Sequence, residues 1–242
     1  MLPKAVQALH YQRRVYRLIE TQEATATLHL VDDLTEQFQL EQMLDQVKPA
    51  YRQGTEHLHY LLKTPFRYPP LRHGSRFGSR QMPGIFYASE HTQTCLAEVA
   101  YYRLLFLQDM LTPYLKPVHS EHMLFQLQLL TTKATDLTLP PVAHLHAQLT
   151  DKRYYGFTQQ LGQWLAEHQC SVIRYRSARS DGVNIAILQP DAIHSTSPEQ
   201  SEQWFCQSSE QAVLFRLKNS SSAPIRFERE AFLVDGVLPR PA

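Results

Sequence analysis

Hydrophobic positions recur at a helical spacing in four parts of the chain. Apolar residues repeat with a period near 3.6 from residue 33 to residue 48, and Pro49 then ends the predicted helix. A second helix is predicted to begin near Thr92, a suitable N-cap residue, and to continue through the apolar run that follows. Residues 151–169 predict a third helix, and basic and apolar residues at roughly helical spacing in residues 1–24 predict a fourth.

Alternating or short, continuous apolar runs predict the β-strands of the chain. These runs occupy residues 25–32, 84–88, 120–130, 134–139, 171–179, 183–189, 211–218 and 224–230. Between the first of them and the others, Pro65, Pro69 and Pro70 predict an extended segment that presents Arg67 and Tyr68. No internal repeat and no long linker divides the chain, so we expect one α+β domain with an N-terminal helical extension.

The composition of the 242 residues supplies a packed core, with 43% hydrophobic and 19% charged residues. The formal net charge is only +1, which gives no long-range field for nucleic acid or anionic lipid. The three cysteines are an odd number without C-x-x-C spacing, which favours a reducing compartment over a disulfide framework. Neither a secretory signal nor an apolar run of about 18 residues is visible, so we expect a cytoplasmic protein without membrane or direct nucleic-acid binding.

Several common types of catalytic or binding site find no support in the sequence. The 12 histidines lack the H-E-x-x-H order and have no cysteine pair nearby, so no metal site is expected. A G-x-S-x-G nucleophile elbow is missing, which argues against a serine hydrolase. The glycine fingerprints of the common dinucleotide-binding and P-loop folds are missing too.

A set of polar residues stands in apolar surroundings, although each member taken alone has an ordinary structural explanation. The glycine-rich stretch HGSRFGSR at residues 73–80 is typical of a loop that holds an anion, because it contributes little to a core. A glutamate on a helix is usually solvent-facing, a tyrosine at a strand end is usually core, and an arginine usually lies on the surface. In chain order, the set is Arg67, Tyr68, Arg76, Tyr87, Glu98 and Ser177.

Three sequence blocks that contain this set resemble the RES domain family. They read FRYPPLRHGSRF, GIFYASEHTQTCLAEVAYYR and IRYRSARSDGVNIAIL, in the order that the family shows, and the resemblance covers roughly residues 60–190. Phe77 departs from the family pattern, since many members carry tryptophan followed by asparagine there. Matched motif by motif, the family's arginines, aromatics, glutamate, serine and a frequent asparagine fall on Arg67, Arg76, Tyr68, Tyr87, Glu98, Ser177 and Asn184.

The resemblance implies a fold, a substrate and a partner. It implies that residues 60–242 form a mixed β-sheet core similar to that of ADP-ribosyltransferase toxins. Residues 1–59 are then an N-terminal extension, which covers the site, binds a partner or completes the core. Family members are toxins of bacterial toxin–antitoxin pairs that destroy NAD by hydrolysis or phosphorolysis, or transfer ADP-ribose to a protein. The implied partner is an Xre-like helix-turn-helix antitoxin, and the resemblance is compatible with a homodimer. The implied substrate is NAD, and no metal is expected.

The residue types suit cleavage of the nicotinamide–ribose bond, which builds positive charge on the ribose. Arg67 and Arg76 are expected to hold the pyrophosphate, because a guanidinium matches phosphate oxygens two at a time. Tyr87, or else Tyr68, would stack on the nicotinamide, and Glu98 would stabilise the developing cation. Ser177 would orient Glu98 or bind the ribose. Transfer of ADP-ribose to a protein and a non-catalytic nucleotide-binding module remain the alternatives at this point.

Overall fold

The structure is a computed structural model that describes residues 8–21, 30–70, 72–112, 114 and 116–240. It combines a mixed sheet with helices, which confirms the predicted α+β class. The strands are β1 (Leu9–Glu20), β2 (Phe86–Ser89), β3 (Val118–Asp136), β4 (Val172–Arg176), β5 (Val183–Ile187), β6 (Glu199–Ser208), β7 (Ala212–Leu217) and β8 (Ile225–Glu228). The α-helices are α1 (Leu34–Gln46), α2 (Tyr60–Arg67), α3 (Thr92–Gln108), α4 (His146–Leu149) and α5 (Gly156–Glu167), with short 3₁₀ turns at Pro140–Leu145, Pro190–Ala192 and Arg229–Phe232.

Part of the sheet closes on itself. The strand order is β1-β2-β5-β4-β3-β6-β7-β8, and β1 also pairs with β3, so five strands form a closed circuit from which β6, β7 and β8 continue. Only β3 and β4 run parallel. The circuit is tightly paired along β1 and β3, whereas β1 and β2 meet only at Tyr16 and Ser89. This narrow pairing is the place where side chains from inside the circuit can reach a ligand.

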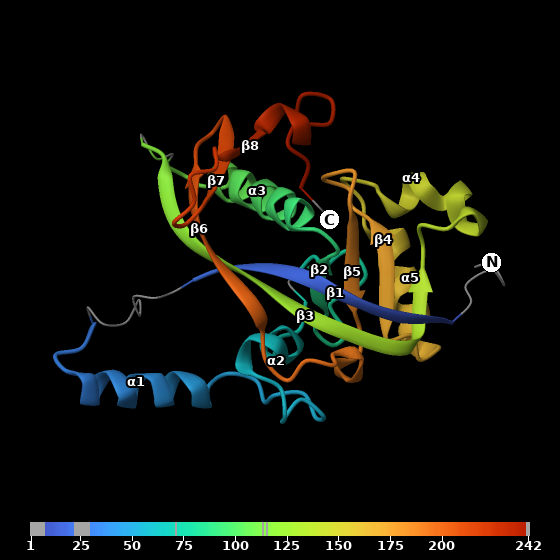
Figure 1. Ribbon diagram of the computed structural model, residues 1–242, viewed down its shortest axis with the longest axis horizontal. Helices are drawn as coiled ribbons and strands as arrows, with labels where there is room; N and C mark the ends of the chain where they lie inside the picture. Colours follow the sequence, from blue (N-terminus) through green and yellow to red (C-terminus); the bar gives the residue numbers. More distant parts are fainter. Residues whose placement is uncertain (1–7, 22–29, 71, 113, 115, 241–242) are drawn as a thin grey trace.

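Helices cover the sheet from separate sides, as Figure 1 shows. Helix α3 packs against β1, β6 and β7, and its inward residues Leu96, Ala100 and Leu104 are fully buried there. Helix α5 packs with β4 and β5 on another side, and α2 adds Leu62 and Phe66 to the cluster inside the closed circuit. The site described below lies between the α3 and α5 sides.

The prediction of a helix over residues 1–24 is wrong for the part that the structure describes, because β1 occupies Leu9–Glu20. Both faces of β1 are covered: Tyr11 and Val15 pack inside the circuit, while Leu18 packs against α3. A strand buried on both faces does not alternate apolar with polar residues, so its apolar positions fall at a spacing that resembles a helix. The strand predicted at residues 25–32 lies largely outside the described residues.

The predicted extended segment around the prolines is also wrong, because α2 contains Pro65. The helix ends at Arg67, so Pro65 removes only the one hydrogen bond that its N–H would donate to Leu61. Leu62 and Phe66, one turn apart, are buried, and each buried side chain contributes about 1.5–3 kcal/mol. Together they offset the roughly 3 kcal/mol that an interior proline costs.

Two long strands extend beyond their sequence signals. Strand β3 is continuous across Lys133, where the sequence predicts a gap, because the chain passes from pairing with β1 to pairing with β4 at Ala134. Strand β6 was not predicted, since most of its residues are polar and only Trp204, Cys206 and Ser208 are buried. Its pairing with β3 and β7 determines its conformation, so tertiary context overrides local preference.

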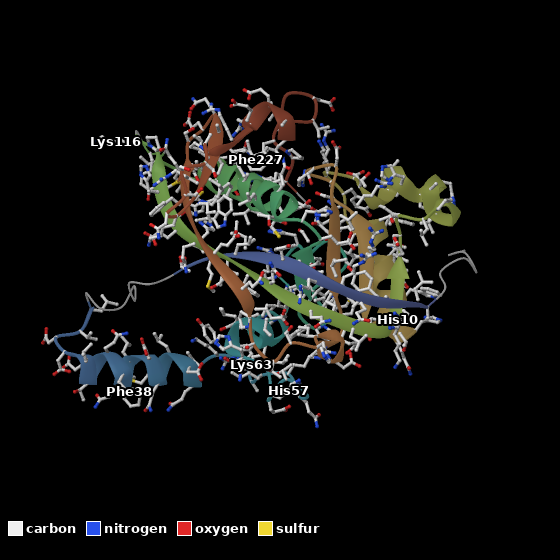
Figure 2. All side chains as sticks on the ribbon, viewed as in Figure 1. His10, Phe38, His57, Lys63, Lys116 and Phe227 are labelled. Atoms are coloured by element: carbon white, nitrogen blue, oxygen red, sulfur yellow. The ribbon has the colours of Figure 1, made fainter. Side chains whose placement is uncertain are left out.

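Helix α1 confirms the predicted helix before Pro49, and Asp33 caps it by accepting from the backbone N–H groups of Thr35 and Glu36. Figure 1 shows that α1 lies away from the sheet, and Figure 2 labels Phe38 on this helix. Large apolar side chains on it remain exposed, among them Leu34, Phe38 and Met43. Within the described residues, no helix is long and apolar enough to cross a membrane.

His122 makes the stability of the fold sensitive to acid. Its ring is 2% exposed in β3 and lies edge-on to Phe215, and its Nδ1 has no hydrogen-bond partner among the described residues. Burial, with a smaller contribution from the charge of Arg103, lowers the pKa of His122 to about 4. The unfolded chain therefore binds this proton below about pH 6.5 while the folded protein does not, so stability falls as the pH drops from 6.5 towards 4.

We expect His122→Phe to flatten this part of the pH dependence, because the phenyl ring fills the same space without binding a proton. Urea unfolding at pH 7, 5.5 and 4.5 measures the slope. His119→Phe, on an exposed position of the same strand, is the matched control and should keep the slope of the wild type. An unchanged slope in His122→Phe would contradict this account.

Candidate functional site

A cavity of about 270 Å³ lies where β1 and β2 separate, under α3. Strands β1, β2, β4 and β5, helix α3 and the glycine-rich loop all contribute side chains to it. Four tyrosines and two arginines line it together with a single carboxylate. The lining residues are Arg17, Leu18, Ser75, Arg76, Tyr87, Ala88, Ser89, Cys95, Glu98, Val99, Tyr102, Tyr155, Tyr175 and Asn184.

Glu98, on α3, is held by two of the residues that the sequence selects. Ser177 Oγ donates to Glu98 Oε1 at 2.6 Å, and Asn184 Nδ2 donates to the same oxygen at 2.5 Å. Asn184 is positioned in turn by Ser89, whose Oγ donates to Asn184 Oδ1 at 2.6 Å. Both bonds end on Oε1, so Oε2 has no hydrogen-bond partner among the described residues and is available to a ligand. The structure thus brings Glu98, Ser177 and Asn184 together; for Asn184, the sequence suggests NAD binding, which stays a prediction.

The turn after β4 places Ser177 beside α3. Ser177 Oγ accepts from the backbone N–H groups of Arg179 and Ser180, which fixes the turn. Gly182 then passes so close to the first turn of α3 that an added Cβ would meet Thr94 Oγ1 at 1.9 Å. Only glycine allows this approach, and the approach brings Ser177 within hydrogen-bond reach of Glu98.

The glycine-rich loop orients Tyr87 and buries Arg76. Gly74 has φ +77°, and the following N–H of Ser75 donates to the carbonyl of Gly78, which makes a tight turn. Tyr87 OH bonds Ser75 Oγ at 2.8 Å and accepts from the backbone N–H of Phe77 at 3.1 Å. Burial raises the pKa of Tyr87 to about 12, so the hydroxyl stays neutral. These N–H groups are therefore used inside the loop rather than turned towards a ligand.

Arg76 lines the cavity, but much of its guanidinium is already bound. Its Nη1 donates to the carbonyls of Leu149 and Asp151, both at 3.1 Å, and its Nη2 donates to Tyr155 OH at 3.2 Å. The guanidinium also lies over the Tyr155 ring, 4.3 Å from its centroid. Its Nε and one Nη2 hydrogen have no partner among the described residues, so Arg76 offers a fixed cation with part of its donor fork available.

Arg17, on β1, is a site residue that the sequence reasoning missed. Its Nη1 donates to the carbonyl of Tyr87 at 2.6 Å, its guanidinium lies over Phe86, and its Nε is buried without a hydrogen-bond partner among the described residues. Burial lowers the pKa of Arg17 to about 10, which leaves it protonated at neutral pH. The signal in the sequence was the stretch VYRLI, an arginine among apolar residues, which the helical interpretation of residues 1–24 concealed.

The structure does not bring Arg67 and Tyr68 to this cavity. Arg67 Nη1 donates to Asp45 Oδ1 at 2.9 Å, its Nε donates to the carbonyl of Pro49, and its guanidinium lies over the Tyr51 ring. These contacts tie the end of α2 to the end of α1. Tyr68 follows Arg67 and is 40% exposed. The geometry therefore gives Arg67 a structural task and assigns the second cation of the cavity to Arg17.

The charges of the cavity favour an anionic ligand. Two arginines face one glutamate, and in the described part of the chain no ion pair joins Arg17, Arg76 or Glu98 to an opposite charge. The described residues contain no group of three histidine, cysteine or acidic side chains that could hold a metal ion. Cations for an anion, flat aromatic rings for a ring system and one oriented carboxylate suit a nucleotide whose reaction develops positive charge.

Asn184 is expected to be sensitive to replacement by aspartate. Asn184→Asp would exchange the donor on Glu98 for a second carboxylate at the same short distance, and two such groups cannot both ionise. The pKa of the new carboxyl would be raised above its unfolded value, so the variant loses stability as the pH rises above about 4. We expect a loss of about 3 kcal/mol at pH 7, and a much smaller one near pH 4.

Urea unfolding at several pH values measures this difference. Asn219→Asp, which changes the chain's other asparagine on an exposed turn, is the matched control and should show almost no loss. A loss for Asn184→Asp that is equal at pH 4 and pH 7 would contradict the proximity of the two carboxylates.

Comparison with known proteins identifies the family. The chain is similar over 80% of its length, at 13% identity and a TM-score of 0.47, to 84% of a chain in the crystal structure of the M.tuberculosis MbcT-MbcA toxin-antitoxin complex. No curated protein matches the chain. The family model described as RES domain matches residues 49–207, so the proposed boundary at residue 59 stays a prediction. Because this match spans more than half of the sequence, the chain belongs to the RES domain family.

Proposed function

We propose that this protein is a toxin that cleaves the nicotinamide–ribose bond of NAD and thereby depletes cellular NAD. The observation that carries the proposal is the carboxylate of Glu98, held on one oxygen by Ser177 and Asn184 in a cavity whose other charges are two arginines. Membership of the RES domain family supports the same reaction class. The reaction breaks the bond between the ribose C1′ and the nicotinamide nitrogen, and an acceptor then takes C1′.

Each side chain has a task that follows from its contacts. Glu98 stabilises the positive charge that develops on the ribose, or binds its hydroxyls, through the oxygen that Ser177 and Asn184 leave free. The hydrogen bonds from Ser177 and Asn184 hold the Glu98 carboxylate in one orientation. Tyr87, fixed by Ser75 and by the N–H of Phe77, presents its ring to the cavity, where a nicotinamide can pack against it.

Arg17 and Arg76 supply the positive charge for the pyrophosphate. Arg17 retains more free donors than Arg76, and its buried Nε lacks a partner in the described chain, so an anion in the cavity would satisfy it. In this proposal Arg17 takes the role that the sequence suggests for Arg67. A cavity of about 270 Å³ is at the small end for ligand sites, so it suits the nicotinamide riboside part better than the whole dinucleotide.

The acceptor and the partners belong to the same proposal. Water would give hydrolysis, inorganic phosphate would give phosphorolysis, and a protein side chain would give ADP-ribosylation. The family resemblance favours a cytoplasmic toxin that an Xre-like antitoxin silences. The protein in the solved structure named above is part of a toxin–antitoxin complex.

Glu98→Gln is expected to lower NAD cleavage about 100-fold or more, because the amide cannot stabilise a cation as a carboxylate does. The fold should survive, since the amide oxygen can still accept from Ser177 and Asn184. Proton NMR of full-length protein with NAD, with and without phosphate, measures free nicotinamide. Glu210→Gln, an exposed and remote glutamate, is the matched control.

Three results, two from this NMR assay and one from a labelled-NAD assay, discriminate between the alternatives. Nicotinamide release by wild type and by Glu210→Gln, but not by Glu98→Gln, supports the proposal, and a phosphate requirement identifies a phosphorylase. Label transfer from NAD to a lysate protein without free ADP-ribose would favour ADP-ribosyltransfer instead. Full activity in Glu98→Gln would refute the assignment of Glu98.

Arg17→Met is expected to lower kcat/KM for NAD about 100-fold, because it removes a buried cation that contacts the ligand. Arg67→Met is the comparison variant: it removes a buried arginine that lies outside the cavity, so it should weaken the packing of α1 while kcat/KM falls much less. Melting temperatures of both variants separate loss of folding from loss of binding. A larger loss of activity in Arg67→Met would return the role to Arg67.

A further inference from the structure

A second depression lies next to the cavity, on the other side of the turn that carries Ser177. Its volume is about 410 Å³, and Ser177 itself is part of its wall. The segment from Leu149 to Lys152 runs between the two spaces. The carbonyls of Leu149 and Asp151 accept from Arg76, and the carbonyl of Lys152 accepts from Arg179 Nη2. The polar residues that line the depression include Thr150, Lys152, Arg176, Arg179, Ser180 and Asp181.

Three cations converge on this depression without neutralisation. In the part of the chain that the structure describes, neither Lys152, Arg176 nor Arg179 forms an ion pair. Arg174, two residues before Arg176 on β4, behaves in the opposite way, since Glu90 and Asp136 both bind its guanidinium. Arg176 is exposed and Lys152 is half-buried, so both can turn towards a ligand. Asp181 is the only acid in the wall, so the depression is positive.

Arg179 lines the depression and carries an unsatisfied donor. It is 8% exposed, and its guanidinium is held flat over the Tyr101 ring, 3.6 Å from the centroid. Its Nη2 donates to the carbonyl of Lys152 at 3.1 Å. Its Nη1 is buried and has no hydrogen-bond partner within the described residues. A buried guanidinium nitrogen without a hydrogen-bond partner costs stability, and an acceptor at that nitrogen would recover the cost.

We propose that Lys152, Arg176 and Arg179 form a binding subsite for a phosphate group. A tetrahedral, doubly charged phosphate can accept from a rigid guanidinium fork and from flexible cations at the same time. The hydroxyls of Thr150 and Ser180 in the same wall add neutral donors. Arg179 supplies the fixed, pre-oriented part of the subsite, and Lys152 and Arg176 close on the ligand from its rim.

The subsite rests on the proposed function and extends it. Ser177 lines the depression and donates to Glu98 in the cavity, so the depression adjoins the residues that hold the proposed catalytic carboxylate. The phosphate can come from two sources. It is either free inorganic phosphate, the co-substrate of a phosphorolysis, or a phosphate of the nucleotide itself.

Isothermal titration calorimetry of the full chain tests the subsite with two probes, inorganic phosphate and ADP-ribose. Lys152→Ala with Arg176→Ala removes two cations from partly or fully exposed positions, so the fold should survive, and a melting curve checks it. The control is Lys116→Ala with Lys133→Ala, which removes the same charge from exposed positions elsewhere; Figure 2 labels Lys116 at the far end of β3. Arg176→Ala alone serves if the double variant unfolds.

We expect the double variant to bind at least one probe about 30-fold more weakly than wild type, and the control to stay within about twofold. A loss for inorganic phosphate identifies an acceptor subsite, and a loss for ADP-ribose alone identifies a subsite for the nucleotide. Equal binding in wild type and double variant, an equal loss in the control, or no binding of either probe to wild type would overturn the proposal.

The failure of the subsite and the failure of the proposed function give different results. Phosphate binding is measured without NAD and does not depend on cleavage. If wild type releases no nicotinamide from NAD, the proposed function fails while the titration still reports on the subsite. If wild type cleaves NAD but the double variant binds both probes normally, the subsite alone is refuted.

Discussion

The hydrogen bonds from Ser177 and Asn184 to one oxygen of Glu98 are the contact on which the site depends. A carboxylate in a partly buried place needs partners, and these two come from different elements, the turn after β4 and strand β5. The chain must therefore bring β5 and this turn against the first turns of α3. The bare backbone of Gly182 at Thr94 permits this approach. The fold and the site therefore form together, because the packing that buries α3 also orients Glu98.

The closure of the sheet explains why the N-terminal strand belongs to the site. Strand β1 pairs with β3 over nearly its whole length but touches β2 at a single pair of residues, so the two strands diverge and leave room for a cavity. Arg17 enters that room from β1 and donates to the carbonyl of Tyr87 on β2. The sequence leaves three roles open for the N-terminal extension. Strand β1 fills one of them, because it completes the core, and it also contributes the cation of Arg17 to the cavity.

The sequence predicts the elements and residues whose signals are local. Helices α1, α3 and α5 show an apolar period of their own, and the motif around Glu98 carries its neighbours in fixed order, so these predictions agree with the structure. Predictions are wrong where contacts with distant parts of the chain determine the local conformation. Strand β1 is covered on both faces, β6 is held by its neighbours, and Pro65 in α2 is tolerated because buried apolar residues outweigh it. Arg17 was missed for the same reason: its role depends on a partner 70 residues away.

Under the proposed function, the distribution of charge matters more for an anionic substrate than its sum does. A formal net charge of +1 attracts nothing over a distance, and most arginines with strong contacts are neutralised, as Arg174 is by Glu90 and Asp136. Cations without such partners, within the described residues, line both spaces beside Ser177: Arg17 and Arg76 in the cavity, and Lys152, Arg176 and Arg179 in the depression. In partly desolvated spaces these charges act strongly at short range and little at long range. Selection of a phosphate-bearing ligand can therefore coexist with a nearly neutral surface, which avoids the unspecific attraction to nucleic acids that a basic protein would have.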